Sequence, residues 1–274
     1  MDIPYELKKS IEELLSKNKT NEVVENAQKI SQKYRNNDGK GKRLLTEQNE
    51  AISYAISRMP ATYSAVYSAV QQTIENYNEK LETLYDIGAG TGAATWAIND
   101  LVEITEAKCF ERENNMLNIG KKLMNNTELN KTEWKQFDIL KDRIVGKADI
   151  VITSYMINEL PENEKETVIE KLWNTTNKLL VIVEPGTPTG FENILKIRKK
   201  ILKDGGYIVA PCSHQEECQI SQNDWCAFYI RVLRSSIHKK AKNGELGYED
   251  EKFSYIAFSK EPSSYGSTNV AVIP

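Results

Sequence analysis

The sequence predicts an α/β protein, in which crossover helices join seven strands into one layered sheet. From residue 83 onward, short β-branched runs alternate with helical stretches. Two of these runs, 149–153 and 179–183, are apolar throughout, which is typical of central strands covered on both faces. A glycine-rich turn follows the first strand and precedes a helix. Together these observations favour a sheet that binds a ligand at its edge.

The composition is that of an ordinary globular protein. Of 274 residues, 40% are hydrophobic and 27% are charged. The longest apolar runs are far shorter than the ~20 residues that cross a bilayer, and the first residues do not resemble a secretory signal. We therefore expect a cytoplasmic monomer without a membrane segment. The net charge of −3 does not by itself indicate nucleic-acid binding, but basic runs at 39–43, 196–200 and 238–242 offer local cations for phosphates.

Residues 1–80 are expected to form a helical region. Apolar residues recur every three to four positions from Leu7 to Leu15 and from Val23 to Tyr34. The glycine-containing stretch 36–42 interrupts this pattern, and Pro60 begins a further helical segment. We expect a second unit at 81–274, with an irregular insertion at about 210–245.

The expected strands are short and separated by helical stretches. They lie at 83–88, 106–111, 133–139, 148–155, 178–185, 206–211 and 253–259.

The turn in "DIGAGTG" places Asp86, Gly88, Gly90 and Gly92 between a strand and a helix. Glycines are needed where the backbone takes positive φ or where a ligand approaches closely. Glu111 ends the next strand about 20 residues later, where a ribose-binding carboxylate belongs. This pattern predicts a nucleotide-containing cofactor. A dinucleotide is one alternative, although its fingerprint places the third glycine one position later, and a vestigial pocket is another.

With Asp86 before it, the G-x-G-x-G spacing resembles the first motif of class I S-adenosylmethionine-dependent methyltransferases. The resemblance implies their Rossmann-like seven-stranded sheet, with Asp138 near the adenine and the residues after the fourth strand at the methyl-transfer site. The candidate cofactor-binding residues are Asp86, Gly88, Gly90, Gly92, Glu111, Asp138 and Ser154. The candidate catalytic residues on the substrate side are Tyr155, Asn158 and Glu184.

The segment after the fourth strand, "TSYMINELP" at 153–161, lacks the Asn/Asp-Pro-Pro-aromatic turn of many amino-methylating enzymes. This departure disfavours an exocyclic base amine as acceptor. Cys212, in "APC", follows the sixth strand, which is the wrong place for the nucleophile of a pyrimidine C5 methyltransferase. The methylated atom therefore stays open.

Three of the four cysteines and both histidines lie between residues 212 and 238. Clustered thiolates bind soft or borderline metals, so Cys212, Cys218 and Cys226 are candidate metal ligands. Their spacing is not that of a zinc ribbon, and buried structural cysteines are the alternative. Cys109, inside an apolar strand, is expected to pack in the core.

Several blocks, in order, resemble the family of methyltransferase-like small-ribosomal-subunit proteins, which includes a mitochondrial assembly factor and bacterial relatives regarded as ribosomal RNA methyltransferases. These blocks lie at 58–70, 86–94, 183–191, 210–219, 224–228 and 247–260. The resemblance covers roughly residues 25–260. It implies a small ribosomal subunit, with its 16S-type RNA, as the partner.

The same resemblance implies a [4Fe-4S] cluster bound by Cys212, Cys218 and Cys226. The family's fourth ligand, from a C-terminal segment, has no counterpart here, so His214 or His238 completes the site or the position is open. Zinc bound by three cysteines and a histidine is the alternative metal. Three functions remain: methylation of ribosomal RNA, non-catalytic subunit assembly, and methylation of a small molecule.

Overall fold

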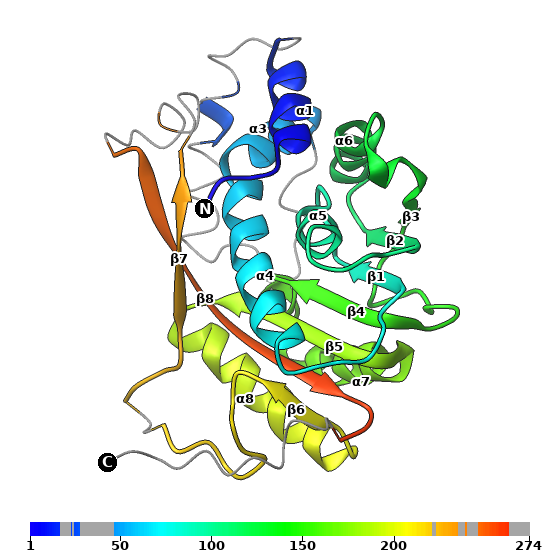
Figure 1. Ribbon diagram of the computed structural model, residues 1–274, viewed down its shortest axis with the longest axis vertical. Coiled ribbons are helices and arrows are strands. Elements are labelled where there is room, and N and C mark those ends of the chain that lie inside the picture. The colour runs from blue at the N-terminus through cyan, green and yellow to red at the C-terminus, as the bar shows by residue number, and fades with distance from the viewer. Residues whose placement is uncertain are drawn as a thin grey trace.

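An eight-stranded sheet runs through the computed structural model, which describes residues 1–16, 23, 25–27, 47–220, 223–234, 239 and 246–262 (Figure 1). The strand order is β3-β2-β1-β4-β5-β8-β6, and β7 pairs with β8 outside this path. The strands are β1 (Thr83–Ile87), β2 (Glu106–Glu111), β3 (Glu133–Gln136), β4 (Ala148–Ser154), β5 (Thr176–Pro185), β6 (Tyr207–Ala210), β7 (Phe228–Leu233) and β8 (Tyr248–Ser259).

The pairing is parallel from β3 to β5 and antiparallel where β8 meets β5, β6 and β7. Each of the seven expected strands is present. The prediction of a seven-stranded sheet was nevertheless wrong by one, because β7 lies inside the segment that was expected to be an irregular insertion. The carboxyl ends of β1, β2, β4 and β5 lie at one edge, where ligands bind in open α/β sheets.

The helices of the described residues are α1 (Tyr5–Ser16), α3 (Gln48–Ser57), α4 (Met59–Ile74), α5 (Ala93–Asn99), α6 (Asn114–Met124), α7 (Lys165–Thr175) and α8 (Pro188–Lys203). Single 3-10 turns are η1 (Glu128–Lys131), η2 (Ile157–Glu159) and η3 (Glu162–Glu164). Before residue 80 the described part contains α1, α3 and α4, whereas Tyr34 and the basic run 39–43 lie outside the described residues. Across the described ranges, no helix is both long and apolar enough to cross a membrane.

Hydrophobic cores fill both sides of the sheet. Alternate residues of β4 face opposite sides: Ile150 and Ile152 join the core with α1, α3 and α4, and Val151 joins the core with α7 and α8. Both faces are therefore buried, as the apolar strands predicted. The N-terminal helices share the first core with the sheet and cover its face (Figure 1).

The strand β8 is longer than its neighbours in the sheet. Pro185, the last residue of β5, pairs with Phe253, so β8 continues past the carboxyl edge of β5 and pairs there with β7 alone. We call Phe228–Leu233 with Tyr248–Phe253 the β7–β8 ribbon. Its inner face packs on α4 through Phe228, whose ring centroid lies 5.1 Å from that of Tyr255.

Candidate functional site

The glycine turn after β1 depends on positive φ at three positions. Gly88, Gly90 and Gly92 have φ of 74°, 57° and 86°, a region that residues with a Cβ rarely adopt. The N–H groups of Gly88 and Ala89 donate to the carbonyl of Phe110 at 2.8 and 3.1 Å. These bonds attach the turn to the end of β2.

Glu111 lies at the turn, as the spacing predicted. Its Oε2 accepts the N–H of Gly90 at 2.7 Å, and its Oε1 accepts the N–H of Glu113 at 2.7 Å. Burial raises the pKa of Glu111, and the two backbone N–H groups oppose that shift. Each carboxylate oxygen can accept a further hydrogen bond, so Glu111 can also bind hydroxyl groups of a ligand.

Asp86 lies beneath the turn and is fully buried. Its Oδ2 accepts the N–H and the hydroxyl of Thr95 at 3.2 and 2.8 Å, at the start of α5. Burial raises the pKa of Asp86 to about 7, against the hydrogen bonds from Thr95. Its Oδ1 and the buried hydroxyl of Thr91 have no partner among the described residues. Sequence reasoning missed Thr91, although it lies inside the glycine motif.

Asp138 follows the end of β3 by two residues and stabilises a local turn. Its Oδ1 accepts the N–H of Leu140 at 3.1 Å, and its Oδ2 lies 3.3 Å from the Lys141 Nζ. The preceding Phe137 donates its N–H to the carbonyl of Glu111 at 3.0 Å. Asp138 and Glu111 therefore follow neighbouring strand ends.

Tyr155 follows half-buried Ser154, the last residue of β4, and has φ of 60°, which is unusual for a residue with a side chain. Its hydroxyl donates to Glu251 Oε1 at 3.0 Å, and the guanidinium of Arg58 lies 3.2 Å from the same oxygen. Burial and the charge of Glu251 raise the pKa of Tyr155 above its ordinary value. We call Arg58, Glu251 and Tyr155 the three-residue bridge. It joins the junction between α3 and α4, the ribbon and the turn after β4.

Met156 brings the two strand ends together. A Cβ on Gly88 would lie only 3.0 Å from the Met156 Cγ, so the glycine turn and the segment after β4 are in contact. A Cβ on Gly90 would meet only the Met116 Cε, at 3.5 Å. The turn is therefore closely packed at Gly88 and open at Gly90.

Glu184 is fully buried, and its carboxylate is occupied by other parts of the protein. Its Oε1 accepts the N–H of Ile157 at 3.1 Å, and its Oε2 accepts the amide of Asn193 at 3.1 Å. Burial raises the pKa of Glu184 to about 8. Asn158 differs, because its Oδ1 is buried without a partner among the described residues. Of the three substrate-side candidates, Asn158 retains a spare acceptor.

The cysteines fall into two groups. Cys109 is fully buried, with its Sγ 3.1 Å from the Thr95 hydroxyl, which confirms its place in the core. Cys212, Cys218 and Cys226 are half-buried free thiols. Burial and the nearby thiols of Cys212 and Cys218 raise the pKa of Cys226. In the described ranges, no three His, Cys, Asp or Glu side chains are close enough to hold a metal ion, and His238 lies outside those ranges.

A buried arginine lies beside these thiols. Arg198, on α8, is 6% exposed and donates from Nη2 to the carbonyls of His214, at 3.4 Å, and Glu216. Burial raises the pKa of the Cys212 thiol, and the positive charge of Arg198 opposes that shift. Its Nε and the His214 Nδ1 are buried without partners among the described residues. No carboxylate of the described chain forms an ion pair with Arg198, so its charge faces carbonyls and a thiol.

Further hydrogen bonds attach the segment that contains Cys212, Cys218 and Cys226, which we call the cysteine segment, to the sheet. The side chain of Gln215 exchanges two hydrogen bonds with the backbone of Ile208, at 2.8 and 3.0 Å. The Trp225 Nε1 donates to the carbonyl of Gly186 at 3.1 Å. The Ser254 hydroxyl donates to the carbonyl of Cys226 at 2.6 Å. The segment is therefore held beside the carboxyl ends of β5 and β6.

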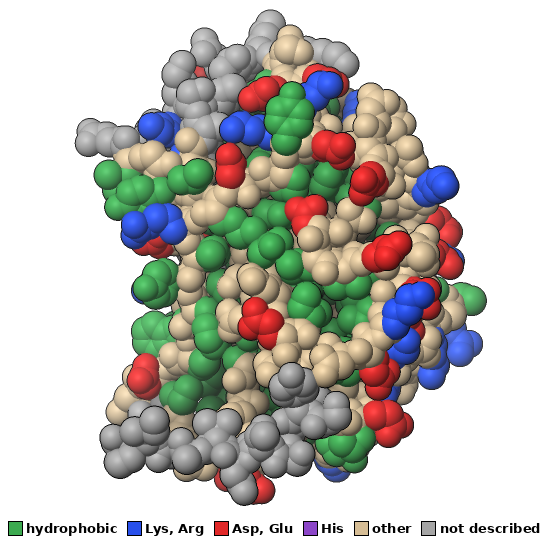
Figure 2. Space-filling model, in the orientation of Figure 1, with side chains coloured by type: hydrophobic (Ala, Val, Ile, Leu, Met, Phe, Trp, Pro, Cys, Tyr) green, Lys and Arg blue, Asp and Glu red, His purple; other side chains and the backbone are tan. Residues whose placement is uncertain are grey.

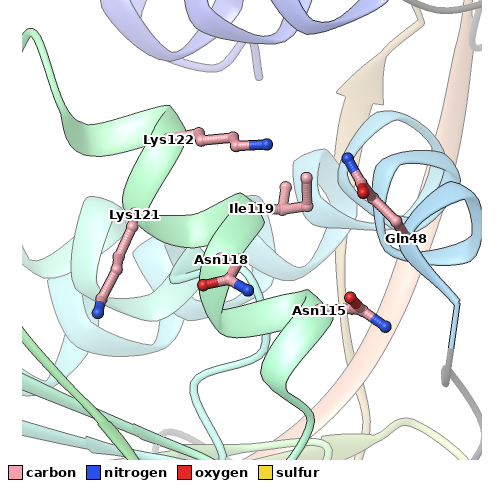
Figure 3. Close-up of a pocket in the computed structure, with 6 residues that line it drawn as sticks. All are labelled: Gln48, Asn115, Asn118, Ile119, Lys121 and Lys122. Atoms are coloured by element: carbon pink, nitrogen blue, oxygen red, sulfur yellow. The ribbon is translucent and has the colours of Figure 1, made fainter.

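A cavity of about 320 Å³ lies elsewhere, between α3 and α6 (Figure 3). Its lining residues are Gln48, Asn115, Asn118, Ile119, Lys121 and Lys122. In Figure 3, Asn115 and Gln48 lie on facing helices, whereas Lys121 points away from both. None of the six residues was a candidate, and no carboxylate lines the cavity.

The fold is that of class I S-adenosylmethionine-dependent methyltransferases. The chain is similar to the crystal structure of the N-methyltransferase NodS from Bradyrhizobium japonicum in complex with S-adenosyl-L-homocysteine, with a TM-score of 0.51 and 10% identity. The match covers 77% of this chain and 92% of NodS. At this identity the similarity establishes the fold alone.

A curated relative is the human ribosome assembly protein METTL17, mitochondrial. It is 26% identical over 231 residues, which cover 77% of this chain and 49% of that protein. The chain therefore spans about half the length of this relative. The model of the family described as mitochondrial small ribosomal subunit Rsm22 matches residues 48–274. This match covers most of the chain, which therefore belongs to the Rsm22 family.

Proposed function

We propose that this chain binds S-adenosylmethionine at the glycine turn and methylates ribosomal RNA of the small subunit. The observation that carries the proposal is the hydrogen bond from the Gly90 N–H to the Glu111 Oε2, with an N–O distance of 2.7 Å, at the carboxyl edge of β1 and β2. The family and its human relative, named for ribosome assembly, support the choice of partner.

The residues of the turn fit this cofactor. Glu111 has acceptor capacity for ribose hydroxyls, and Asp138 follows the adjacent strand end, where the adenine would lie. The spare Asp86 Oδ1 and the Thr91 hydroxyl offer polar contacts to the amino-acid part of the cofactor. Gly90 leaves open space, and Ser154 ends the facing strand.

When bound, S-adenosylmethionine supplies a methyl group already activated on a sulfonium, so the protein needs mainly to align the acceptor and exclude water. Asn158, with its spare carbonyl oxygen, is proposed to orient the acceptor nucleotide. Glu184 acts as a positioning residue, because it holds the backbone of Ile157 beside Asn158. Tyr155 keeps the same segment in place through the three-residue bridge.

The test is a calorimetric titration of S-adenosylmethionine into the purified full chain. We expect saturable binding to the wild type and none to Gly90→Arg, because the new side chain fills the open side of the turn. Wild-type protein that is folded but does not bind would contradict the proposal.

We also propose a metal site formed by Cys212, Cys218, Cys226 and His214. Three thiolates and an imidazole suit a [4Fe-4S] cluster or zinc. The support is the electrostatic effect of the Cys212 and Cys218 thiols on Cys226, the spare His214 Nδ1, and the positive charge of Arg198, which favours the anionic form of Cys212. In the described structure these side chains are not gathered closely enough to bind a metal, so the proposed site requires them to move together. A bound metal would stabilise the segment beside the sheet edge, since ligand ordering and metal binding share one free energy.

Replacement of one ligand tests the metal site. We expect Cys218→Ser to lower both the metal content of anaerobically purified protein and its Tm. Elemental analysis and the visible spectrum distinguish iron from zinc. An unchanged metal content per chain refutes the ligand role and favours buried structural thiols.

A second candidate is a non-catalytic assembly factor, as the name of the human relative suggests. The observation that favours it is the internal pairing of Tyr155 and Glu184, which leaves neither free to contact a substrate. In this case Gly90→Arg would lose the cofactor and still support assembly of small subunits in cells that lack the wild-type chain.

A further inference from the structure

The β7–β8 ribbon has an outer face that packs against no described element. Residues opposite each other in an antiparallel pair lie on one face, and the pairs here are Tyr229 with Lys252, Arg231 with Asp250, and Leu233 with Tyr248. The alternate residues of β7, which face inward, pack toward α4. The six paired residues therefore form one surface, which we call the outer ribbon face.

This face combines an exposed ring and an exposed aliphatic side chain with cations. Tyr229 is 72% exposed and Leu233 is 51% exposed. The Arg231 guanidinium lies 4.0 Å from the centroid of the Tyr248 ring and pairs with Asp250 at 2.9 Å. Figure 2 shows hydrophobic and basic side chains along the left margin of the molecule, over β7 in Figure 1.

The charge of the surface is positive. Arg231 and exposed Lys252 accompany a single carboxylate, that of Asp250. Lys239 adds a third cation, because its Nζ lies 3.8 Å from where a Cβ of Gly247 would be, next to Tyr248. An exposed aromatic ring beside cations suits an unpaired nucleotide, whose base can stack on the ring and whose phosphate can pair with a cation. A protein partner would favour a more apolar patch with fewer lysines.

The position of the ribbon also fits a nucleic acid. It stands beyond the carboxyl edge of β5, where Pro185 pairs with Phe253. From its inner face, Glu251 accepts the hydroxyl of Tyr155 in the turn after β4. The ribbon is therefore joined directly to the segment that carries Asn158.

We propose that the outer ribbon face binds single-stranded RNA, with a base stacked on Tyr229 and phosphates held by Lys252 and Arg231. The inference deepens the proposed function and rests on it for the choice of RNA. It assigns substrate recognition to β7, the strand that is additional to the seven expected strands.

The experiment measures fluorescence anisotropy of a labelled single-stranded oligoribonucleotide, and of a duplex of the same length, with the full chain. We expect Tyr229→Ala to weaken single-strand binding by about tenfold. Tyr229→Phe should bind like the wild type, because the ring is retained. Lys252→Gln should weaken binding less and reduce its dependence on salt. The matched control is Tyr207→Ala, since Tyr207 is 39% exposed on β6 and pairs with Ser259, at the opposite end of β8.

The outcomes separate this inference from the proposed function. Equal RNA affinity of the wild type and Tyr229→Ala overturns the inference and leaves methyl transfer standing. A tenfold loss without cofactor binding by the wild type supports the ribbon and overturns the methyltransferase. If Tyr229→Ala retains RNA affinity but converts a wild-type dimer to a monomer in sedimentation, the face binds a second copy and the inference is wrong. Wild-type protein that binds no RNA contradicts both.

Discussion

The two halves of the sheet edge use their polar groups differently. At β1 and β2, the glycine turn is open at Gly90, and Asp86 and Thr91 each retain a buried atom without a partner among the described residues. At β4 and β5, Tyr155 and Glu184 are bound to other parts of the chain. We propose that the first half receives the cofactor. In the second half Tyr155 and Glu184 are tied to the ribbon and to α8 and η2, and Asn158 alone of the three candidates retains a spare acceptor.

Under the proposed function, cofactor binding and substrate placement therefore depend on different groups of residues. The first half depends on local geometry within one turn and its neighbouring strand. The second depends on Arg58, at the junction between α3 and α4, and on Glu251, in the ribbon. A change in the ribbon can therefore alter the position of the substrate side without touching the glycine turn.

The largest expected effect is on the open half. Gly90→Arg should weaken S-adenosylmethionine binding by at least about a hundredfold, or ~2.7 kcal/mol, measured by calorimetry. The matched control is Gly205→Arg. Gly205 also has positive φ, at 82°, and no atom lies within 4 Å of its added Cβ. Both variants should lose similar stability from backbone strain, but only Gly90→Arg should lose the cofactor, and equal loss in both would contradict a role of the turn.

The second effect concerns the three-residue bridge. Arg58→Gln leaves the Glu251 carboxylate, whose side chain is 13% exposed, without its cation. We expect a loss of about 2 kcal/mol in the free energy of unfolding, measured in denaturant. Asp250→Asn, which breaks an exposed pair on the same ribbon, should cost much less, because solvent screens that pair. Similar losses would mean that the bridge does not stabilise the substrate half.

A smaller effect is expected at the cysteine segment. Arg198→Gln removes the buried cation that binds the carbonyls of His214 and Glu216. We expect lower metal content and a loss of about 1 kcal/mol, or roughly 2–4 °C in Tm. Exposed Lys199, the next residue of α8, supplies the control Lys199→Gln. If both variants bind metal like the wild type, Arg198 does not support the site.

The last effect is a change in pH dependence. The pKa of Glu184 rises from 4.5 to about 8 in the folded protein, so between these values the folded state holds a proton that the unfolded state has released. Stability from this group is therefore greatest below pH 4.5 and is lost as pH rises toward 8. Glu184→Gln should flatten the decline of Tm between pH 5 and 8. Part of the decline in Tm should remain in Glu184→Gln, because the pKa of Asp86 is also raised, to about 7. An unchanged slope would show that Glu184 is ionised at neutral pH.

The same division explains how much the sequence alone could predict. The glycine turn and Glu111 were found because both depend on local spacing along β1 and β2. The Tyr155 contact with Glu251 joins residues 96 positions apart, and the Arg58 contact with Glu251 joins residues 193 apart, so no local pattern indicates them. Glu184 was chosen as a carboxylate near the carboxyl end of β5, but its hydrogen-bond partners come from α8 and η2.

The ribbon was missed for a different reason. The residues of β7 alternate between inward apolar and outward side chains, which is the pattern of a half-buried strand. The cysteines before it and the basic run after it favoured an irregular insertion. No sequence pattern indicated that Arg198 is buried, because it lies in the basic run 196–200, whose composition is typical of a solvated helix face.

The measurement that tests the central claim most directly is methyl transfer to small ribosomal subunits. Anaerobically purified protein would be incubated with S-adenosylmethionine carrying a labelled methyl group and subunits from cells that lack this chain. We predict label in the ribosomal RNA with the wild type and none with Gly90→Arg. If the protein holds both cofactor and metal and the RNA gains no label, methyl transfer is contradicted and the chain acts in assembly without catalysis.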